Sequence, residues 1–251
     1  MTGPDAPQPP RLCAIVPTYD NPQTIRAVVG AVRAHVPQVL VVDDGSADAG
    51  RQAVEALARD GLALTRRRAQ NGGKGAAVKT GLGFACELGF THALQVDADG
   101  QHEVADVPRF VDAAREHPEA LVLGVPVFDG SAPQVRSRGR LISRFWTDLE
   151  TGGRVIQDPL CGFRVYPVAS ALAAAALGDR MDFDVEIAVR MVWLGCRVVS
   201  IPTKVRYLTQ AEGGVSHFRM FRDNVLISWA HTRLCAEALW RLAMGRPLRP
   251  S

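Results

Sequence analysis

The sequence predicts an open, mostly parallel α/β sheet with helices on both of its faces. Short apolar runs rich in β-branched residues alternate with segments of helical periodicity. Several of these runs end abruptly in polar residues, as strands buried on both faces do. The 251 residues, 47% of them hydrophobic, are enough for one domain with a sizeable core.

The alternation begins with a β-α-β unit. "LCAIVPTY" (12–19) and "VLVVDDGS" (39–46) predict strands, and "NPQTIRAVVGAVRAHV" (21–36) between them predicts a helix. Asn21 is the expected N-cap of this helix, with Pro22 at its first position.

The same alternation continues to residue 125. The next expected elements are a helix near 47–59, a strand at 62–67, a helix at 74–88, a strand at 92–96, a helix near 104–116 and a strand at 120–125. In such sheets ligands bind at the carboxyl ends of the strands, where the polar clusters at 17–21, 43–46 and 97–102 lie.

After residue 126 the pattern is less regular. "FDGSAPQVRSRGRLISRFW" is a polar, glycine-bearing loop that leads into a helix with four arginines, as in a mobile lid or an anion site. We then expect a turn and strand at 158–167, a helix at 182–195, a strand at 196–202 and a long amphipathic helix at 218–245.

Composition bounds the class of protein. The proline-rich start has no apolar stretch, so we expect a loose tail at 1–10, one α/β domain at 11–217, and a basic helix and tail at 218–251. The sequence contains no run of about 18 apolar residues, so no membrane span is predicted. Five scattered cysteines without a C-x-x-C pair indicate reduced cytoplasmic thiols rather than disulfides or zinc. A net charge of +3 is too small to indicate nucleic acid.

The segment "LQVDADGQH" places Asp97 and Asp99 just past a buried strand. Two such carboxylates repel each other unless a cation or hydrogen-bond donors neutralise them, and a divalent ion is the simplest partner. The alternative is a solvated acidic turn. The spacing excludes an EF-hand loop, and hard oxygen ligands suit Mg²⁺ or Mn²⁺.

The segment "QNGGKGAAVKTG" suggests a phosphate cradle but matches neither the P-loop nor the dinucleotide-binding pattern. It is either a flexible turn before a helix or a site where Lys74, at the helix start, meets a diphosphate.

Seven motifs in order, "VPTYDN", "VVDDGS", "NGGKGAA", "DADGQH", "GRLISR", "DPLCGFRVY" and "FDVEIAVR", resemble family 2 glycosyltransferases of the GT-A fold. Within that family the chain resembles the dolichol-phosphate mannosyltransferase-like branch, over roughly residues 12 to 217. The resemblance implies a GT-A nucleotide-diphospho-sugar transferase fold.

The predicted donor-binding residues are Pro17, Tyr19, Asn21, Val41, Asp43, Lys74, Asp97 and Ala98. The resemblance implies that Asp43 accepts a hydrogen bond from the base or ribose, and that Asp97, Asp99 and Gln101 surround Mg²⁺ or Mn²⁺ and the donor diphosphate. The predicted acceptor-binding residues are Arg140, Arg144, Ser216 and His217.

Two departures from the family pattern stand out. Asn21 occupies a position that is often acidic, and "AEGGVSH" has Ala211 and His217 where the family has an arginine and a lysine. The second change removes two fixed positive charges from the expected site of a lipid phosphate. Arg206, Arg219 and Arg222 are candidates to replace them.

The catalytic residues we predict are Asp99, Arg140, Asp184 and Glu186. A lipid phosphate acceptor is already ionised near neutral pH and needs no protein base. A hydroxyl acceptor needs a carboxylate base, for which Asp158, Asp184 and Glu186 are candidates. Alternatively, all three carboxylates serve only to cap helices or to form ion pairs.

The C-terminal helix has two interpretations. Leu226, Trp229, Leu234 and Trp240, with arginines between them, fit a helix lying on an anionic membrane. The alternatives are a helix packed on the core or a dimer contact. His231 is expected to be a packed polar residue rather than a ligand.

Together these features predict a cytoplasmic, inverting, metal-dependent hexosyltransferase, peripheral on the inner face of the membrane. The resemblance implies GDP-mannose or UDP-glucose as the donor and a lipid as the acceptor, with a polyprenyl phosphate expected first and a hydroxyl of another lipid or polyene second. A sugar nucleotidyltransferase is disfavoured because "PTYDN" stands where a G-G-x-G-T-R loop is expected. A catalytically silent nucleotide-sugar-binding module and an oligomer stay open.

Overall fold

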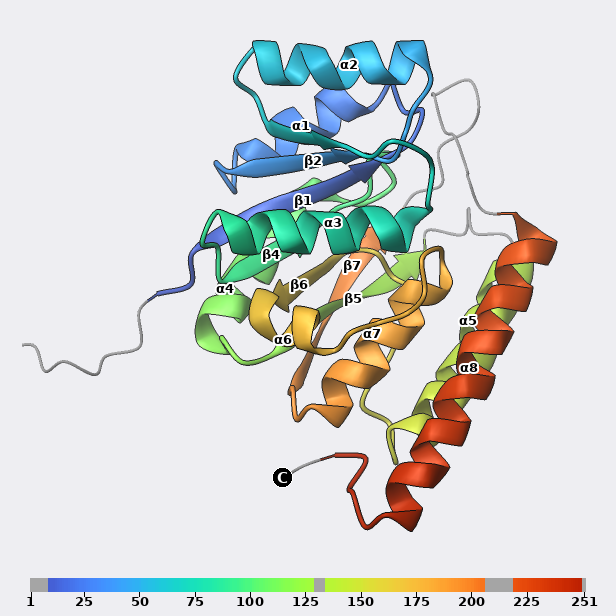
Figure 1. Ribbon diagram of the computed structural model, residues 1–251. Helices are drawn as coiled ribbons and strands as arrows, with labels where there is room; N and C mark the ends of the chain where they lie inside the picture. Colours follow the sequence, from blue (N-terminus) through green and yellow to red (C-terminus); the bar gives the residue numbers. More distant parts are fainter. Residues whose placement is uncertain (1–8, 129–133, 206–218, 250–251) are drawn as a thin grey trace, which may run out of the picture.

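The computed structural model describes residues 9–128, 134–205 and 219–249. Within them lies one seven-stranded sheet of order β3-β2-β1-β4-β6-β5-β7 (Figure 1). The strands are β1 (Leu12–Thr18), β2 (Val39–Asp43), β3 (Leu64–Arg67), β4 (His92–Gln95), β5 (Leu121–Phe128), β6 (Arg164–Pro167) and β7 (Val198–Val205). Of these, β6 alone runs antiparallel to its neighbours, so the mostly parallel α/β sheet is confirmed.

Helices cover both faces of the sheet. They are α1 (Ile25–Arg33), α2 (Asp48–Arg59), α3 (Lys74–Glu87), α4 (Val107–Glu116), which follows the short 3-10 helix η1 (Val104–Asp106), α5 (Gln134–Glu150), α6 (Val168–Ala173), α7 (Asp182–Trp193) and α8 (Met220–Ala243). Side chains of α1, α2 and α4 share one core cluster, and those of α3, α6 and α7 share the other.

Strand β1 shows how the sequence serves both cores. Cys13 and Ile15 lie in the cluster with α3 and α7, whereas Ala14 and Val16 lie in the cluster with α1 and α4. Successive side chains of a strand point to opposite faces, so a strand covered on both sides has to be continuously apolar. All four side chains are fully buried.

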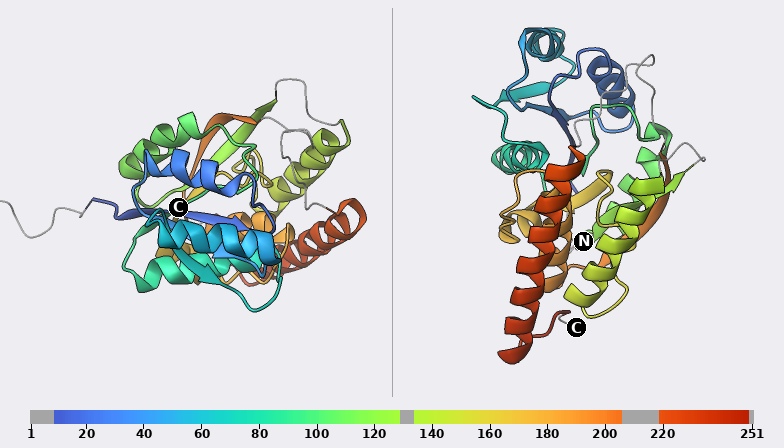
Figure 2. Two further views of the ribbon diagram at one scale, coloured as in Figure 1. Left: turned by 90° about the horizontal axis from the view of Figure 1, so that it is seen from above. Right: turned by 90° about the vertical axis from the view of Figure 1, so that its right-hand side faces the viewer.

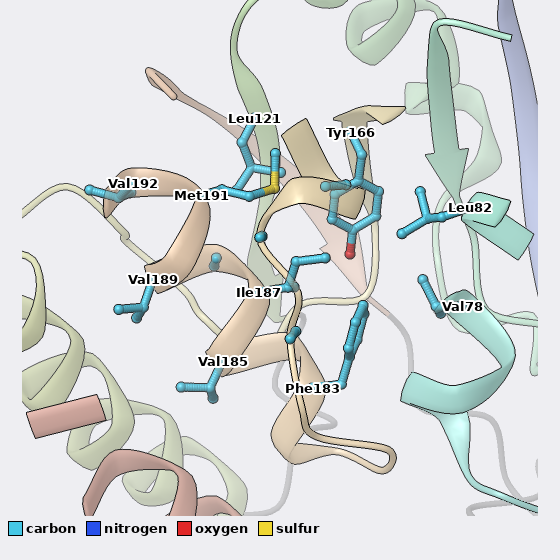
Figure 3. Close-up of a cluster of buried hydrophobic side chains, with 14 of the residues drawn as sticks. Val78, Leu82, Leu121, Tyr166, Phe183, Val185, Ile187, Val189, Met191 and Val192 are labelled. Carbon is cyan, nitrogen blue, oxygen red and sulfur yellow. The ribbon is translucent and has the colours of Figure 1, made fainter. Parts of the chain in front are cut away.

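Helix α7 is enclosed on nearly all sides. Figure 3 shows Phe183 and Ile187 pointing toward Val78 of α3 and Tyr166 of β6, while Val189 points the other way. On its other side α7 packs against α8. Every side chain of α7 except Arg190 is buried.

Helices α5 and α8 lie side by side at one end of the molecule (Figures 1 and 2). Ile227, Ala230 and Leu234 form the buried face of α8, while Phe221 (85% exposed) and Trp229 (59%) lie on its other side. No helix in the three described ranges is both long and apolar enough to cross a membrane.

The predicted arrangement of α8 is partly wrong. Trp229 and Trp240 are exposed as expected, but Leu234 is only 1% exposed and belongs to the core. Arg233 also faces inward, with Nη2 3.1 Å from Oε2 of Glu186. The helix therefore packs on the core through one face and leaves an apolar strip on the other.

The predicted N-cap at Asn21 is wrong. Helix α1 begins at Ile25 with Thr24 at the N-cap position, after a turn. Asn21 Oδ1 instead accepts hydrogen bonds from Thr18 Oγ1 and Tyr19 N, both at 3.4 Å, because its side chain turns back to the end of β1. Helix α6, of six residues, was not predicted because it is too short to show a helical period.

Two glycines of α3 provide a test of the packing on β1. A Cβ at Gly81 would lie 2.5 Å from Ile15 Cγ2, whereas a Cβ at Gly83 would meet nothing within 4 Å. We expect Gly81→Ala to lower the free energy of unfolding by about 1–3 kcal/mol through overpacking. Gly83→Ala should raise it by about 0.5–1 kcal/mol through helix propensity. Urea unfolding followed by circular dichroism measures both, and equal effects would contradict the close approach of α3 to β1.

Candidate active site

A cleft of about 1530 Å³ lies at the carboxyl ends of β1, β2 and β4 and extends between α5 and α8. Its walls combine segments that are far apart in the sequence. Nine of the predicted site residues line it: Pro17, Tyr19, Lys74, Asp97, Ala98, Asp99, Gln101, Arg140 and Asp184.

Lys74 lines the cleft. Its Nζ is 2.9 Å from Asp97 Oδ2 and 3.0 Å from Asp184 Oδ2. Burial disfavours the ammonium ion, but the charges of Asp184 and Asp97 outweigh burial and raise the pKa of Lys74. Lys74 therefore stays charged and joins the start of α3 to the end of β4 and to α7.

Asp97 and Asp99 have opposite electrostatic surroundings. Burial opposes the ionisation of Asp97, but Lys74 and the hydrogen bond from His102 outweigh it and lower the pKa of Asp97. Burial, followed by the charge of Asp97, raises the pKa of Asp99. Asp99 Oδ1 accepts a hydrogen bond from Gln101 N at 3.0 Å. Asp99 thus lies beside a second carboxylate, and no cationic side chain of the described residues forms an ion pair with it.

These residues fit a divalent cation. Asp97, Asp99 and Gln101 supply the hard oxygen atoms that Mg²⁺ and Mn²⁺ prefer, and a cation would relieve the cost of ionising Asp99. In the described part of the chain no three His, Cys, Asp or Glu side chains converge on a metal position. Mg²⁺ usually completes its shell with water and substrate phosphates, so two carboxylates are sufficient protein ligands.

Arg140 and Asp158 form a second ion pair beside the cleft. Arg140 Nη1 lies 2.6 Å and 2.7 Å from the two oxygens of Asp158, and Asp158 Oδ1 also accepts from Leu160 N at 2.9 Å. Asp158 therefore already pairs with a guanidinium group and a backbone N–H, and both are ordinary structural contacts.

Glu186 does not reach the cleft. It is fully buried, and it accepts from Gly178 N at 2.8 Å and from Arg190 Nε at 2.8 Å. Burial alone would raise its pKa, but these hydrogen bonds and Arg233 lower it. The predicted catalytic role of Glu186 is not supported, because α7 turns it toward α8 while Asp184 faces the cleft.

The structure does not bring all of the predicted donor-binding residues to the cleft. Val41 is fully buried within β2, and Asn21 and Asp43 are not among the lining residues. Asp43 accepts from Ser46 N at 2.9 Å and pairs with Arg67. Asp44, which was not predicted, lines the cleft instead.

Asp44 holds the glycine-rich turn before α3. Its carboxylate accepts from Gly73 N at 2.7 Å and from Gly72 N at 3.1 Å, and Arg68 Nε lies 2.8 Å away. The sequence has two adjacent aspartates, Asp43 and Asp44, and does not show which of them faces the cleft, since neighbours on a strand point in opposite directions.

The basic residues of the cleft differ in part from those predicted. Arg144 does not line it, and Ser216 and His217 lie outside the described residues. Arg180, at the start of α7, and Arg219 and Arg222, at the start of α8, do line it. Arg219 and Arg222 were considered from the sequence, but Arg180 was not, because nothing in its local pattern distinguishes it from a surface arginine.

Arg164 supports the cleft from behind. It is fully buried and donates to the backbone carbonyls of Cys161 at 2.6 Å, Asp184 at 2.7 Å and Pro159 at 2.8 Å. A guanidinium group can satisfy three carbonyls in fixed directions. Arg164 therefore ties the segment before β6 to the start of α7, which presents Asp184.

The sequence profile described as "Glycosyl transferase family 2" matches residues 13–172. An undecaprenyl-phosphate mannosyltransferase of Micrococcus luteus is 30% identical over 208 residues, which cover 76% of this chain and 82% of that protein. A polyprenol monophosphomannose synthase of Mycolicibacterium smegmatis is 30% identical over 221 residues, which cover 82% of this chain and 80% of that protein.

Solved structures share the fold. The crystal structure of glucosyl-3-phosphoglycerate synthase from Mycobacterium tuberculosis with phosphoglyceric acid superposes with a TM-score of 0.69 at 14% identity, covering 90% of this chain and 80% of that one. The same enzyme with Mn²⁺, uridine diphosphate and phosphoglyceric acid gives a TM-score of 0.68 at 14% identity, over 90% and 78% of the two chains. The predicted GT-A-like architecture is confirmed at the level of the fold.

The arrangement of Asp97 and Asp99 predicts a pH-dependent response to Mn²⁺. Because the pKa of Asp99 is raised, ionising it costs folding free energy as the pH rises through its folded pKa, and a bound cation offsets that cost. At 100 times Kd, Mn²⁺ should raise the Tm by about 5–10 °C, and the rise should be smaller at pH 5 than at pH 7. Differential scanning fluorimetry checks this in the absence of substrate.

Two variants complete that measurement. Asp99→Asn should lose most of the Mn²⁺ effect, whereas Asp112→Asn, on the exposed surface of α4, should keep it. An equal Mn²⁺ response in both variants would show that Asp99 does not hold the ion.

Proposed function

Because the chain belongs to glycosyl transferase family 2, we propose that it is an inverting, metal-dependent hexosyltransferase that uses a nucleotide sugar to glycosylate a polyprenyl phosphate. The observation that carries this proposal is the cleft itself, where Asp97 and Asp99 lie together with three arginines at the starts of α7 and α8, namely Arg180, Arg219 and Arg222. The names of the two bacterial relatives, a mannosyltransferase and a phosphomannose synthase, favour a prenyl phosphate acceptor.

The donor would lie at the carboxyl ends of β1 and β4. A divalent ion held by Asp97, Asp99 and Gln101 would stabilise the negative charge of the departing nucleoside diphosphate. Pro17 and Tyr19 line the neighbouring wall, where a nucleotide would contact them. Mn²⁺ and uridine diphosphate occur together in a solved structure of the same fold, which supports this assignment of the donor end.

The acceptor end would be basic. Arg180, Arg219 and Arg222 line the cleft, and no ion pair joins their guanidinium groups to a carboxylate in the described part of the chain. Guanidinium groups bind phosphate strongly. We assign the acceptor phosphate to these three side chains, which would replace the two charges missing from "AEGGVSH".

The candidate bases favour a phosphate over a hydroxyl as the attacking group. Asp184 is paired with Lys74, Asp158 is paired with Arg140, and Glu186 lies outside the cleft. None of these carboxylates is poised to remove a proton. An ionised phosphate needs no such base, so attack on the sugar C1 opposite the leaving group would proceed with inversion.

We also propose that the exposed side of α5 and α8 rests on an anionic membrane. Leu141 (66% exposed), Phe145 (58%), Phe221 (85%) and Trp229 (59%) lie on these neighbouring helices. Large apolar side chains that are exposed together on neighbouring helices mark a surface that contacts a partner or a membrane. A membrane is the partner that fits a lipid acceptor.

Turnover tests the main proposal. With Mn²⁺ or Mg²⁺, nucleoside diphosphate should be released from GDP-mannose or UDP-glucose only when a short polyprenyl phosphate is present. Asp99→Ala should reduce release by about a hundredfold or more, because it removes charge stabilisation of the leaving group. Asp112→Ala is the matched control and should stay active. Metal-dependent release that the lipid does not stimulate would instead favour a hydroxyl acceptor.

Sedimentation with anionic vesicles tests the membrane surface. The double variant Phe221→Glu and Trp229→Glu should lose most vesicle binding, since it places two charges on the apolar side of α8. Leu64→Glu, on β3 at the opposite edge of the sheet, is a matched exposed control that should bind like the wild type. If all three proteins sediment equally, α8 does not contact the membrane.

A further inference from the structure

The cleft has an arm that the proposed reaction does not use. It runs between α5 and α8 and is lined by Ser143 and Trp146 from one helix and by Ile227, His231 and Cys235 from the other. His231 lies nine residues beyond Arg222, so about 13 Å of helix separates it from the basic end of the cleft. A ligand whose phosphate lies at Arg222 can extend its chain into this arm.

A buried pair of polar groups lies in this arm. His231 Nδ1 is 2.8 Å from Glu150 Oε1, and the thiol of Cys235 donates to the same oxygen at 3.6 Å. Glu150 is fully buried and His231 is 5% exposed. The helices α5 and α8 are therefore joined by a carboxylate and an imidazole rather than by apolar side chains alone.

Two atoms of this pair are left without a hydrogen bond. They are His231 Nε2 and Glu150 Oε2, both buried and without a partner among the described residues. An unsatisfied buried polar atom destabilises the fold, and a buried ion pair is seldom worth more than apolar packing. The need to hold two helices together does not by itself explain the pair.

The chemistry of the pair limits what can bind there. A carboxylate only accepts, so Nδ1 carries the proton and Nε2 is an acceptor when the ring is neutral and a donor when it is charged. A hydroxyl group can satisfy Nε2 in either state, because it both donates and accepts. A second anion would be repelled by Glu150.

We propose that the arm between α5 and α8 holds the acceptor chain and that His231, oriented by Glu150, hydrogen-bonds a hydroxyl group carried on that chain. The inference rests on the proposed function, because it takes the acceptor to be a lipid phosphate. It adds that the arm prefers an acceptor chain that carries a hydroxyl group over a plain hydrocarbon chain. His231 is in this role a specificity residue that recognises the chain at a distance from the phosphate.

Binding to the full-length protein, without donor, tests the inference. Isothermal titration calorimetry would compare alkyl phosphates of eight, ten and twelve carbons with the same compounds bearing a terminal hydroxyl. At one or more lengths the hydroxylated compound should bind about fivefold more tightly, which corresponds to about 1 kcal/mol for one net hydrogen bond. This comparison needs only the wild-type protein.

Two variants assign that preference to the residue. His231→Leu should bind both compounds alike, whereas His35→Leu, an exposed histidine beyond α1, should keep the wild-type preference. Equal affinities at every length, no binding of either compound, or a preference that persists in His231→Leu would overturn the subsite. Release of nucleoside diphosphate with an unhydroxylated polyprenyl phosphate is measured separately, so the loss of the subsite leaves the proposed transferase reaction standing.

Discussion

The shape of the cleft depends on one buried ammonium group, that of Lys74, between Asp97 and Asp184. The glycines around it make room for this contact. A Cβ at Gly162 would collide with Lys74 Nζ, and a Cβ at Gly75 would collide with Phe183 of α7. The glycine that follows Lys74 in "NGGKGAA" is therefore explained by the close approach of α3 to α7, and the ammonium that a phosphate cradle would need is already neutralised by two carboxylates.

The sheet and the position of the paired aspartates were predictable from the sequence, whereas the orientation of several site residues was not. Strands such as β1 are apolar on both faces, which local pattern alone reveals. Asp184 and Glu186 are two residues apart and so lie on different sides of α7, as their spacing predicts. Which side faces the cleft depends on tertiary packing, because α7 is buried nearly all round and offers no polar face as a guide.

The orientation of helix α8 likewise could not be predicted from its sequence. Its sequence carries apolar residues on two opposite sides, and only the fold shows that Leu234 belongs to the core and Trp229 to the surface. Arginines between apolar residues indicate a membrane-binding surface only if they lie on the exposed side of the helix. Arg233 instead reaches Glu186, so part of the basic charge of the tail stabilises the contact between α7 and α8.

The pair formed by α5 and α8 links the chemistry of the cleft to the surface of the molecule. One side of the pair lines the cleft through Ser143 and His231, while the other exposes Phe145 and Trp229. A lipid chain held between the two helices would therefore have its phosphate at the basic start of α8 and its tail close to the apolar exterior. Such a chain could reach the donor without passing through bulk water, since hydrocarbon is costly to expose. The polar contact between Glu150 and His231 lies on this path, where it would distinguish chains by what they carry and not only by their length.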